Sequence, residues 1–160
     1  GWGNRPMPGR CKTAMAIAVL LSMLAGPAAR AGADPADGEV AAEALLAEPA
    51  AYLLVDIRQS GETPHEVPVE GLAQERLTFP TGGSGPMHEA GLATFYAGLK
   101  DLVRRYPGRR LVLACGIAAR SREALRLAPG YGLQGRLWHL ADGLEGNDRG
   151  IGLLDAVRLR

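Results

Sequence analysis

Two short, continuous apolar runs most constrain how this chain can fold. Residues 51–57 (AYLLVDI) and 110–115 (RLVLAC) have the length of a strand and little alternation between apolar and polar side chains. Such runs are typical of strands that are covered on both faces, as in parallel sheets. A third run of similar length lies at residues 136–140 (RLWHL). Because helical segments separate the runs, the sequence predicts an α/β domain built on a parallel sheet.

The clearest helix is predicted over residues 88–106. Its apolar residues recur at i, i+3, i+4 and i+7, and Pro107-Gly108 ends the pattern. Shorter helices are predicted over residues 39–48, 121–127 and 153–159.

Residues 59–88 are predicted to be mostly loop, because they hold four prolines and a Gly-rich patch. One short strand is expected near residues 76–79. The patch itself, residues 81–86 (TGGSGP), lacks the Gly-Lys-Ser/Thr that a phosphate-binding loop needs, so it is predicted to be a surface loop.

Residues 1–31 are predicted to be a secretory signal peptide. Arg10 and Lys12 precede an apolar run, and Ala29-Arg30-Ala31 offers small residues at the spacing of a cleavage site. The run is shorter than the roughly 20 apolar residues that span a bilayer, so we expect no stable membrane insertion after cleavage; a retained anchor is the alternative. Residues 32–38 are then a linker and residues 39–160 one domain, which is expected to be periplasmic or secreted in a bacterium.

Charge and composition exclude several classes of function. Four of the 18 basic side chains, but none of the 17 acidic ones, lie in residues 1–31, so the remainder is weakly acidic and no nucleic-acid partner is expected. The chain has two cysteines and three scattered histidines, which do not have the spacing of metal ligands. No metal is therefore expected. Cleavage after Ala31 would remove Cys11 and leave Cys115 as a lone thiol.

The most informative segment is residues 115–121 (CGIAARS), between a predicted buried strand and a predicted helix. Ligands of parallel α/β sheets bind at the carboxyl ends of strands. A cysteine ahead of a helix N-terminus meets free backbone N–H groups and the positive end of the helix dipole, which favour the thiolate. Arg120 adds a fixed positive charge, and Ser121 is a candidate helix N-cap. The alternative is a small buried hydrophobic residue at a strand end.

Three segments resemble the rhodanese-like domains. Leu54-Val-Asp-Ile-Arg58 with Glu62 resembles the Asp-x-Arg-x-x-x-Glu signature near the start of that family. Cys115…Arg120-Ser121 resembles its active-site loop, and residues 141–146 (ADGLEG) are similar to its C-terminal Gly-Gly-x-x-Gly-Trp segment. The three pieces fall in the family order and cover most of residues 39–152.

The resemblance implies a five-stranded parallel sheet flanked by helices, and a sulfurtransferase whose Cys115 carries sulfane sulfur as a persulfide. The loop from Cys115 to Arg120 has six residues, as in sulfurtransferases of the family, whereas related phosphatases and arsenate reductases use one more. Neither metal nor organic cofactor is implied. The expected partner is a small sulfur-donor anion such as thiosulfate, or a protein thiol. The implied substrate-binding residues are Gly116, Ile117, Ala118, Ala119, Arg120 and Ser121.

The chain departs from the family pattern at three places. Gly116 stands where members often have Arg or Lys, Ala118 where they have Gly, and Asn147 where they have Trp. These departures leave a second hypothesis open, a catalytically impaired rhodanese-like module that binds an anion or a partner protein in the periplasm. A thiol redox role is a third, although the domain offers no resolving cysteine.

One exported subgroup is also similar. Rhodanese-like proteins associated with quinoprotein alcohol oxidation share the export signal and an Asp-Gly like Asp142-Gly143. The present chain departs from their Cys-x-x-Cys-Trp loop at Ala118 and Ala119.

Other candidate residues receive structural interpretations. Asp56 and Arg58 are predicted to form a structural pair that Glu62 joins. His139 lies in a predicted strand, where a base role near Cys115 is the less favoured interpretation. Two aromatic residues, Tyr96 and Trp138, are predicted to lie in or near the core.

Overall fold

A five-stranded, all-parallel sheet forms the centre of the protein in a computed structural model, which describes residues 3, 38–62, 66–133 and 135–160. The strand order is β1-β5-β4-β2-β3. The predicted α/β class with a parallel sheet flanked by helices is confirmed. The sheet strands are β1 (Glu39–Val40), β2 (Tyr52–Asp56), β3 (Ala73–Arg76), β4 (Arg110–Ala114) and β5 (Leu137–Leu140).

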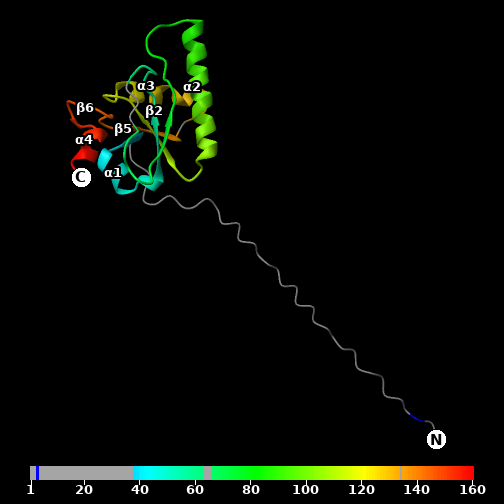
Figure 1. Cartoon of the computed structure of the whole chain (residues 1–160). Coiled ribbons are helices and arrows are strands. Elements are labelled where there is room, and N and C mark those ends of the chain that lie inside the picture. The colour runs from blue at the N-terminus through cyan, green and yellow to red at the C-terminus, as the bar shows by residue number, and fades with distance from the viewer. Residues whose placement is uncertain (1–2, 4–37, 63–65, 134) are drawn as a thin grey trace.

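Helices cover both faces of this sheet. The helices are α1 (Ala42–Ala47), α2 (Pro86–Arg105), α3 (Ala119–Leu127) and α4 (Leu153–Arg158), with 3-10 turns at Pro49–Ala51 and Ala128–Tyr131. A small antiparallel hairpin joins β6 (Gly146–Asn147) to β7 (Gly150–Ile151). Figure 1 shows α2 on one side of the sheet and α1 with α4 on the other.

Alternate residues of the central strands belong to two separate hydrophobic cores, one on each face of the sheet. Leu54 of β2 and Val112 of β4 pack with α1 and α4, whereas Leu53 and Leu113 pack with α2 and α3. Every residue of β2 and β4 is buried, which explains their continuous apolar runs. Tyr96 and Trp138 are buried, as predicted.

Tyr96 connects the two helices of one face. Its hydroxyl donates a hydrogen bond of 2.6 Å to the carbonyl oxygen of Ala124 in α3, and its ring stacks on Tyr131 with centroids 4.1 Å apart. This contact fixes α3 against α2, and therefore fixes the segment that enters α3 from β4.

The first predicted helix is wrong at its start. Residues 39–48 were predicted as one helix, but Glu39–Val40 pair with His139 and Leu140 as a two-residue strand before α1 begins. A strand of two residues is too short to show a periodicity of its own, and only its pairing with β5 defines it.

The strand predicted near residues 76–79 lies earlier, at Ala73–Arg76. The polar side chains of Gln74, Glu75 and Arg76 concealed this edge strand from the hydrophobic pattern. The backbone still continues along β2, because the amides of Leu77 and Phe79 donate to Asp56 and Ile57. The other predicted elements are found with ends moved by a few residues, and residues 81–85 are loop as expected.

The predicted signal peptide and the question of membrane insertion concern the N-terminal residues and the helices, respectively. The predicted signal peptide, residues 1–31, and most of the linker lie outside the described part of the chain, as does Cys11. None of the helices in the described segments combines the length and the apolar character needed to cross a bilayer.

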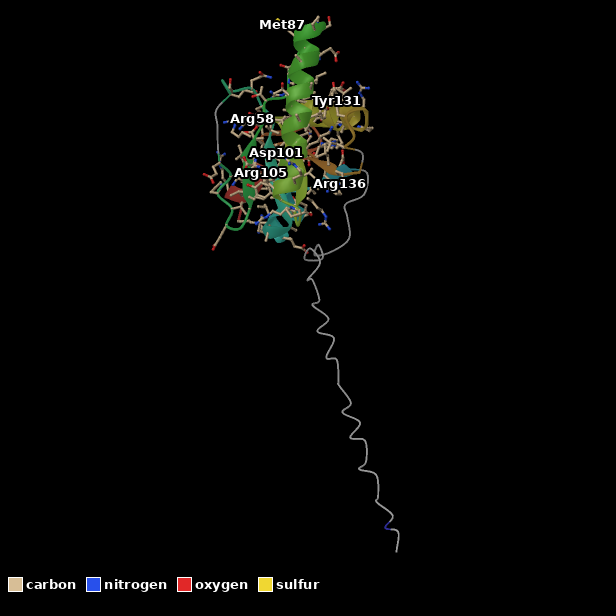
Figure 2. The ribbon with its side chains drawn as sticks, turned by 90° about the vertical axis from the view of Figure 1, so that its right-hand side faces the viewer. Arg58, Met87, Asp101, Arg105, Tyr131 and Arg136 are labelled. Atoms are coloured by element: carbon tan, nitrogen blue, oxygen red, sulfur yellow. The ribbon has the colours of Figure 1, made fainter. Side chains whose placement is uncertain are left out.

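We predict that substitutions along α2 separate core from surface. Leu99→Ala removes a fully buried side chain and should lower the free energy of unfolding by about 2–5 kcal/mol. Met87→Ala, near the far end of the same helix (Figure 2), removes an exposed side chain and should change it by less than about 0.5 kcal/mol. Equal losses in urea unfolding would contradict the packing of α2 described above.

Candidate functional site

Cys115 lies directly after β4, the middle strand of the sheet, in the four-residue connection to α3. Its side chain is 0% exposed and packs in the core between the sheet, α2 and α3. The carboxyl end of a central parallel strand is the position at which α/β proteins bind ligands. The predicted loop and its cysteine are therefore at the expected edge of the fold, with the sulfur below the surface.

The carbonyl groups at the start of this loop are all held by one C-terminal segment. The amide of Leu144 donates to the carbonyl oxygen of Cys115 over 2.8 Å, and that of Glu145 donates to Gly116 over 2.9 Å. The side-chain amide of Asn147 donates to Ile117 over 3.2 Å. Asn147 thus holds the loop by a hydrogen bond.

These three bonds set the direction of the loop's N–H groups. In a trans peptide the C=O and the following N–H point in opposite directions, so the next three amides turn away from the C-terminal segment. Within the described part of the chain, the amides of residues 116–120 have no hydrogen-bond acceptor. Such a set of free amides at a helix start is suited to an anion.

Ala118 makes the turn into α3 in a left-handed conformation, with φ 78° and ψ −7°. Among the described residues it is the one non-glycine with positive φ. Such a conformation costs an L-residue about 1–2 kcal/mol. Ala118 therefore adopts a backbone conformation that glycine adopts more readily.

Ser121 contacts the sulfur and is not the helix N-cap that the sequence suggested. The helix begins at Ala119 with Ala118 as its cap, so Ser121 lies in the first turn. Its amide donates to the Cys115 Sγ over 3.4 Å, and the thiol lies 3.6 Å from its Oγ. Its hydroxyl also reaches the carbonyl oxygen of Ala118 at 3.1 Å. A hydrogen bond from an amide to sulfur stabilises the thiolate.

Arg120 is held by Glu62. Two hydrogen bonds of 2.6 and 2.8 Å join its guanidinium to the Glu62 carboxylate, which also accepts from the Gln59 amide. The pair with Arg120 is the main cause that lowers the pKa of Glu62 from 4.5 to about 2, and it raises the pKa of Arg120. The guanidinium expected to bind an anion is therefore already neutralised by a carboxylate.

Glu62 interacts by its charge with Arg58, as predicted, but its side-chain hydrogen bonds are made with Arg120. Asp56 and Arg58 do form the expected pair, with two side-chain bonds of 3.0 and 2.9 Å in a buried position. That bond is the main cause that raises the pKa of Arg58. Glu62 instead connects the Asp-x-Arg-x-x-x-Glu segment to the cysteine loop through Arg120.

A further carboxylate, that of Glu145, lies against the residue after the cysteine. A Cβ atom built on Gly116 would lie 3.0 Å from the Glu145 Oε2. The sequence analysis did not identify Glu145, because only the folded C-terminal segment brings it to the loop. With Arg58 and Arg120 each paired to an acid, the surroundings of the loop carry no excess of positive charge.

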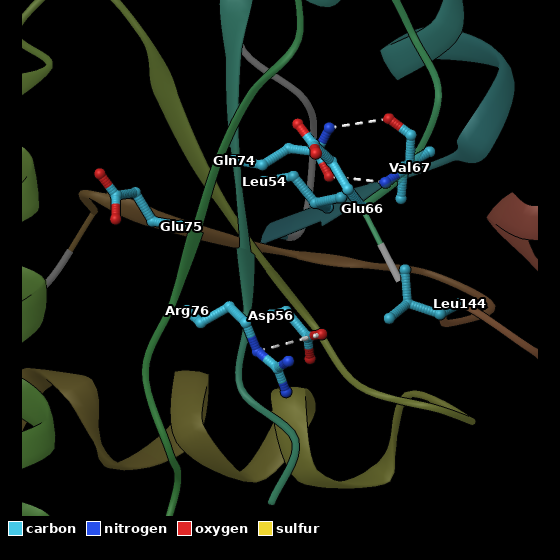
Figure 3. Close-up of a pocket in the computed structure, with 8 residues that line it drawn as sticks. All are labelled: Leu54, Asp56, Glu66, Val67, Gln74, Glu75, Arg76 and Leu144. Atoms are coloured by element: carbon cyan, nitrogen blue, oxygen red, sulfur yellow. Dashed lines mark hydrogen bonds and ion pairs between the residues drawn. The ribbon is translucent and has the colours of Figure 1, made fainter. Parts of the chain in front are cut away.

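Cavities lie on two sides of this region. An open one of about 380 Å³ lies between the Gly-rich loop and the start of α3, with Gly82, Gly83, Ala119 and Arg120 in its wall. Another of about 470 Å³, shown in Figure 3, lies between Leu54, Val67 and Leu144 on one side and Arg76 on the other. The first adjoins the cysteine loop directly.

The three histidines of the sequence are further candidates for a chemical role. His139 of β5 is buried and reaches Ser121, whereas His88 lies in the first turn of α2 and His65 outside the described residues. Within the described segments, no three His, Cys, Asp or Glu side chains gather in a way that could hold a metal ion.

No family model, curated protein or solved structure matches this chain.

We predict that Gly143 is needed for the contact between the C-terminal segment and the loop. Its φ is +71°, and an added Cβ would overlap the Gly116 carbonyl. Gly143→Ala should lower the free energy of unfolding by about 3 kcal/mol or more, because strain adds to overlap. Gly71→Ala is the matched control, since Gly71 has φ +82° but open space around it, and should cost about 1 kcal/mol. Equal losses in urea unfolding would contradict the close approach.

The Arg120–Glu62 pair should appear as an acid-dependent part of stability. The folded-state pKa of Glu62 is lowered, so its contribution is present above pH 4.5 and is lost as the pH falls toward 2. Because the Glu62 side chain is 36% exposed, Glu62→Gln should cost only about 1 kcal/mol or less at neutral pH, and nothing near pH 2.

Chemical unfolding at several pH values measures this difference. Glu70→Gln, which removes an exposed acid without an ion pair to any described residue, controls for overall charge. A Glu62→Gln loss that stays constant from neutral to acid pH would contradict the pairing.

Proposed function

We propose that residues 39–160 form a divergent rhodanese-like domain whose Cys115 carries sulfane sulfur as a persulfide. The observation that carries this proposal is the position of the Cys115 sulfur. It lies at the carboxyl end of the middle strand of a five-stranded parallel sheet and accepts a hydrogen bond from the Ser121 amide at 3.4 Å. We further propose that residues 1–31 export this domain to the periplasm.

The proposed reaction proceeds in two transfers. The Cys115 thiolate attacks the outer sulfur of the donor, the bond between the two donor sulfurs breaks, and the leaving thiolate or sulfite keeps that electron pair. Cys115 then carries one extra sulfur with a negative charge, which the free amides of residues 116–120 are placed to stabilise. A second nucleophile attacks this sulfur and restores the Cys115 thiolate.

The charges around the loop favour a persulfide over thiosulfate as the donor. Thiosulfate has two negative charges, and the guanidinium groups of Arg58 and Arg120 are already paired with Asp56 and Glu62. Glu145 adds a further negative charge beside Gly116. A singly charged persulfide meets less repulsion. The cavity beside the Gly-rich loop is the proposed entrance.

A second candidate function, a rhodanese-like module that binds without transferring sulfur, is favoured by a specific observation. The Cys115 side chain is fully buried, and the Arg120 guanidinium is occupied by Glu62. Both features oppose attack on a substrate in solution. Such a module would bind an anion or a partner protein at the same loop, and Cys115→Ser would leave that binding unchanged.

Sulfur loading separates the two candidates. The chain with Cys11→Ser, in which Cys115 is the remaining cysteine, is mixed with glutathione persulfide or thiosulfate, and its intact mass is measured before and after cyanide. We expect a gain of one sulfur atom on Cys115, faster from the persulfide, that cyanide removes as thiocyanate.

The matched control carries Cys115→Ser in the same background. Equal sulfur gain in both proteins would place the sulfur elsewhere. No gain from either donor, with the fold intact, would reject the transferase and leave the binding module.

A further inference from the structure

Four side chains form a continuous line from the buried sulfur to the surface. The Cys115 Sγ lies 3.6 Å from the Ser121 Oγ, which lies 3.5 Å from Nδ1 of His139. On the other side of the imidazole ring, Nε2 lies 3.3 Å from Oε1 of Glu39. His139 is 2% exposed, whereas the Glu39 side chain is 37% exposed. The line therefore has a buried end and an end that reaches solvent.

The sheet register places these groups in order. His139 of β5 pairs with Leu113 of β4 on one side and with Glu39 of β1 on the other. Ser121 comes from the first turn of α3 and contacts the Cys115 sulfur just beyond the end of β4. Three strands and one helix thus converge on a single path, and this path is separate from the amide contacts that residues 144–147 make with the loop.

The Glu39 carboxylate decides how the protons are arranged. It accepts hydrogen bonds only, so Nε2 of His139 carries the proton that faces it, and in the neutral ring Nδ1 is then an acceptor. In the structure the Ser121 hydroxyl donates to the carbonyl oxygen of Ala118 over 3.1 Å, so the relay requires it to rotate to Nδ1 at 3.5 Å, while the thiol donates to its Oγ. Each member of the line can then pass a proton to the next.

We propose that Ser121, His139 and Glu39 form a proton relay that converts the buried Cys115 thiol into a thiolate. The thiol proton passes to Oγ of Ser121, and the hydroxyl's own proton passes to Nδ1 of His139. The electron pair of the S–H bond stays on sulfur, and the positive imidazolium is stabilised by the Glu39 carboxylate. The net charge of the four groups does not change. His139 and Glu39 act through Ser121 and are positioning residues.

The other charges near the relay act in both directions. Burial is the main cause that lowers the pKa of His139, and Arg122 lowers it further, whereas Glu39 raises it. The neutral imidazole can therefore accept a proton, while the same burial opposes the imidazolium and the Glu39 carboxylate favours it. Arg149 lies 3.5 Å from the Glu39 carboxylate and within 3.8 Å of Asp142. This arginine favours negative charge at the Glu39 end of the line.

The relay gives a buried thiol a way to ionise without exposing it to water. The relay rests on the proposed function in one respect only, because the thiolate that it forms is the nucleophile of the proposed sulfur transfer. Its test therefore measures the thiolate itself, which forms whether or not sulfur is transferred.

The experiment follows the ultraviolet absorbance of the thiolate against pH in the chain with Cys11→Ser, with the spectrum of Cys115→Ser subtracted. Adding Ser121→Ala or His139→Gln should move the appearance of the thiolate to higher pH by about one unit, a tenfold change in its fraction at a given pH. Glu39→Gln should move it by about half a unit, because Glu39 is partly exposed. At high pH every variant should regain the full thiolate signal, and urea unfolding shows separately that the signal comes from folded protein.

Two controls make the outcomes decisive. Glu43→Gln removes a nearby exposed carboxylate on α1 and should leave the curve in place. Urea unfolding shows whether each variant is folded, and the conservative Glu39→Gln keeps the test valid if His139→Gln does not fold.

A curve that Glu39→Gln and Ser121→Ala both leave unchanged would overturn the relay, and so would a thiolate that forms only on unfolding. Sulfur loading with an unchanged curve supports the proposed function and rejects the relay. A shifted curve without loading supports the relay and rejects the transferase.

Discussion

The whole site depends on hydrogen bonds between the loop after β4 and the C-terminal segment. Leu144, Glu145 and Asn147 hold three successive carbonyl groups of residues 115–117. A peptide unit cannot turn its C=O one way without turning the following N–H the other way. The bonds therefore create the row of free amides, and they also bring the Glu145 carboxylate to Gly116. The same hydrogen bonds therefore determine the direction of the loop amides and the position of the negative charge beside them.

Electrostatics at this loop differ from what its residue types suggest. Taken alone, Arg120 indicates a positively charged site for an anion, but its guanidinium donates two parallel hydrogen bonds to Glu62. Stabilisation of a sulfur anion is left to neutral groups, namely the loop amides and the first turn of α3. Such dipoles stabilise a single negative charge and attract a doubly charged ion less strongly than a free guanidinium does. The proposed preference for a persulfide follows from this difference.

The sequence predicted best those elements whose burial requires a continuous run of apolar residues. The runs at residues 51–57 and 110–115 predicted two central strands, and the second run placed Cys115 at a strand end, since strands buried on both faces need apolar residues throughout. Glu39 was assigned to a helix, because a two-residue strand is defined only by its partner β5. The roles of Glu145 and Glu62 depend on tertiary contacts between segments far apart in sequence, which no local spacing encodes.

Ala118 has a consequence for how the loop responds to its neighbours. A non-glycine residue with φ 78° would relax to a right-handed or extended conformation if its surroundings released it. This left-handed residue costs about 1–2 kcal/mol, and the hydrogen bond from Asn147 to Ile117 holds the peptide group directly before it. Loosening the hairpin at Asn147 would be transmitted through the Ile117 carbonyl to the next residue, and the row of amides would lose its alignment without any change to the cysteine.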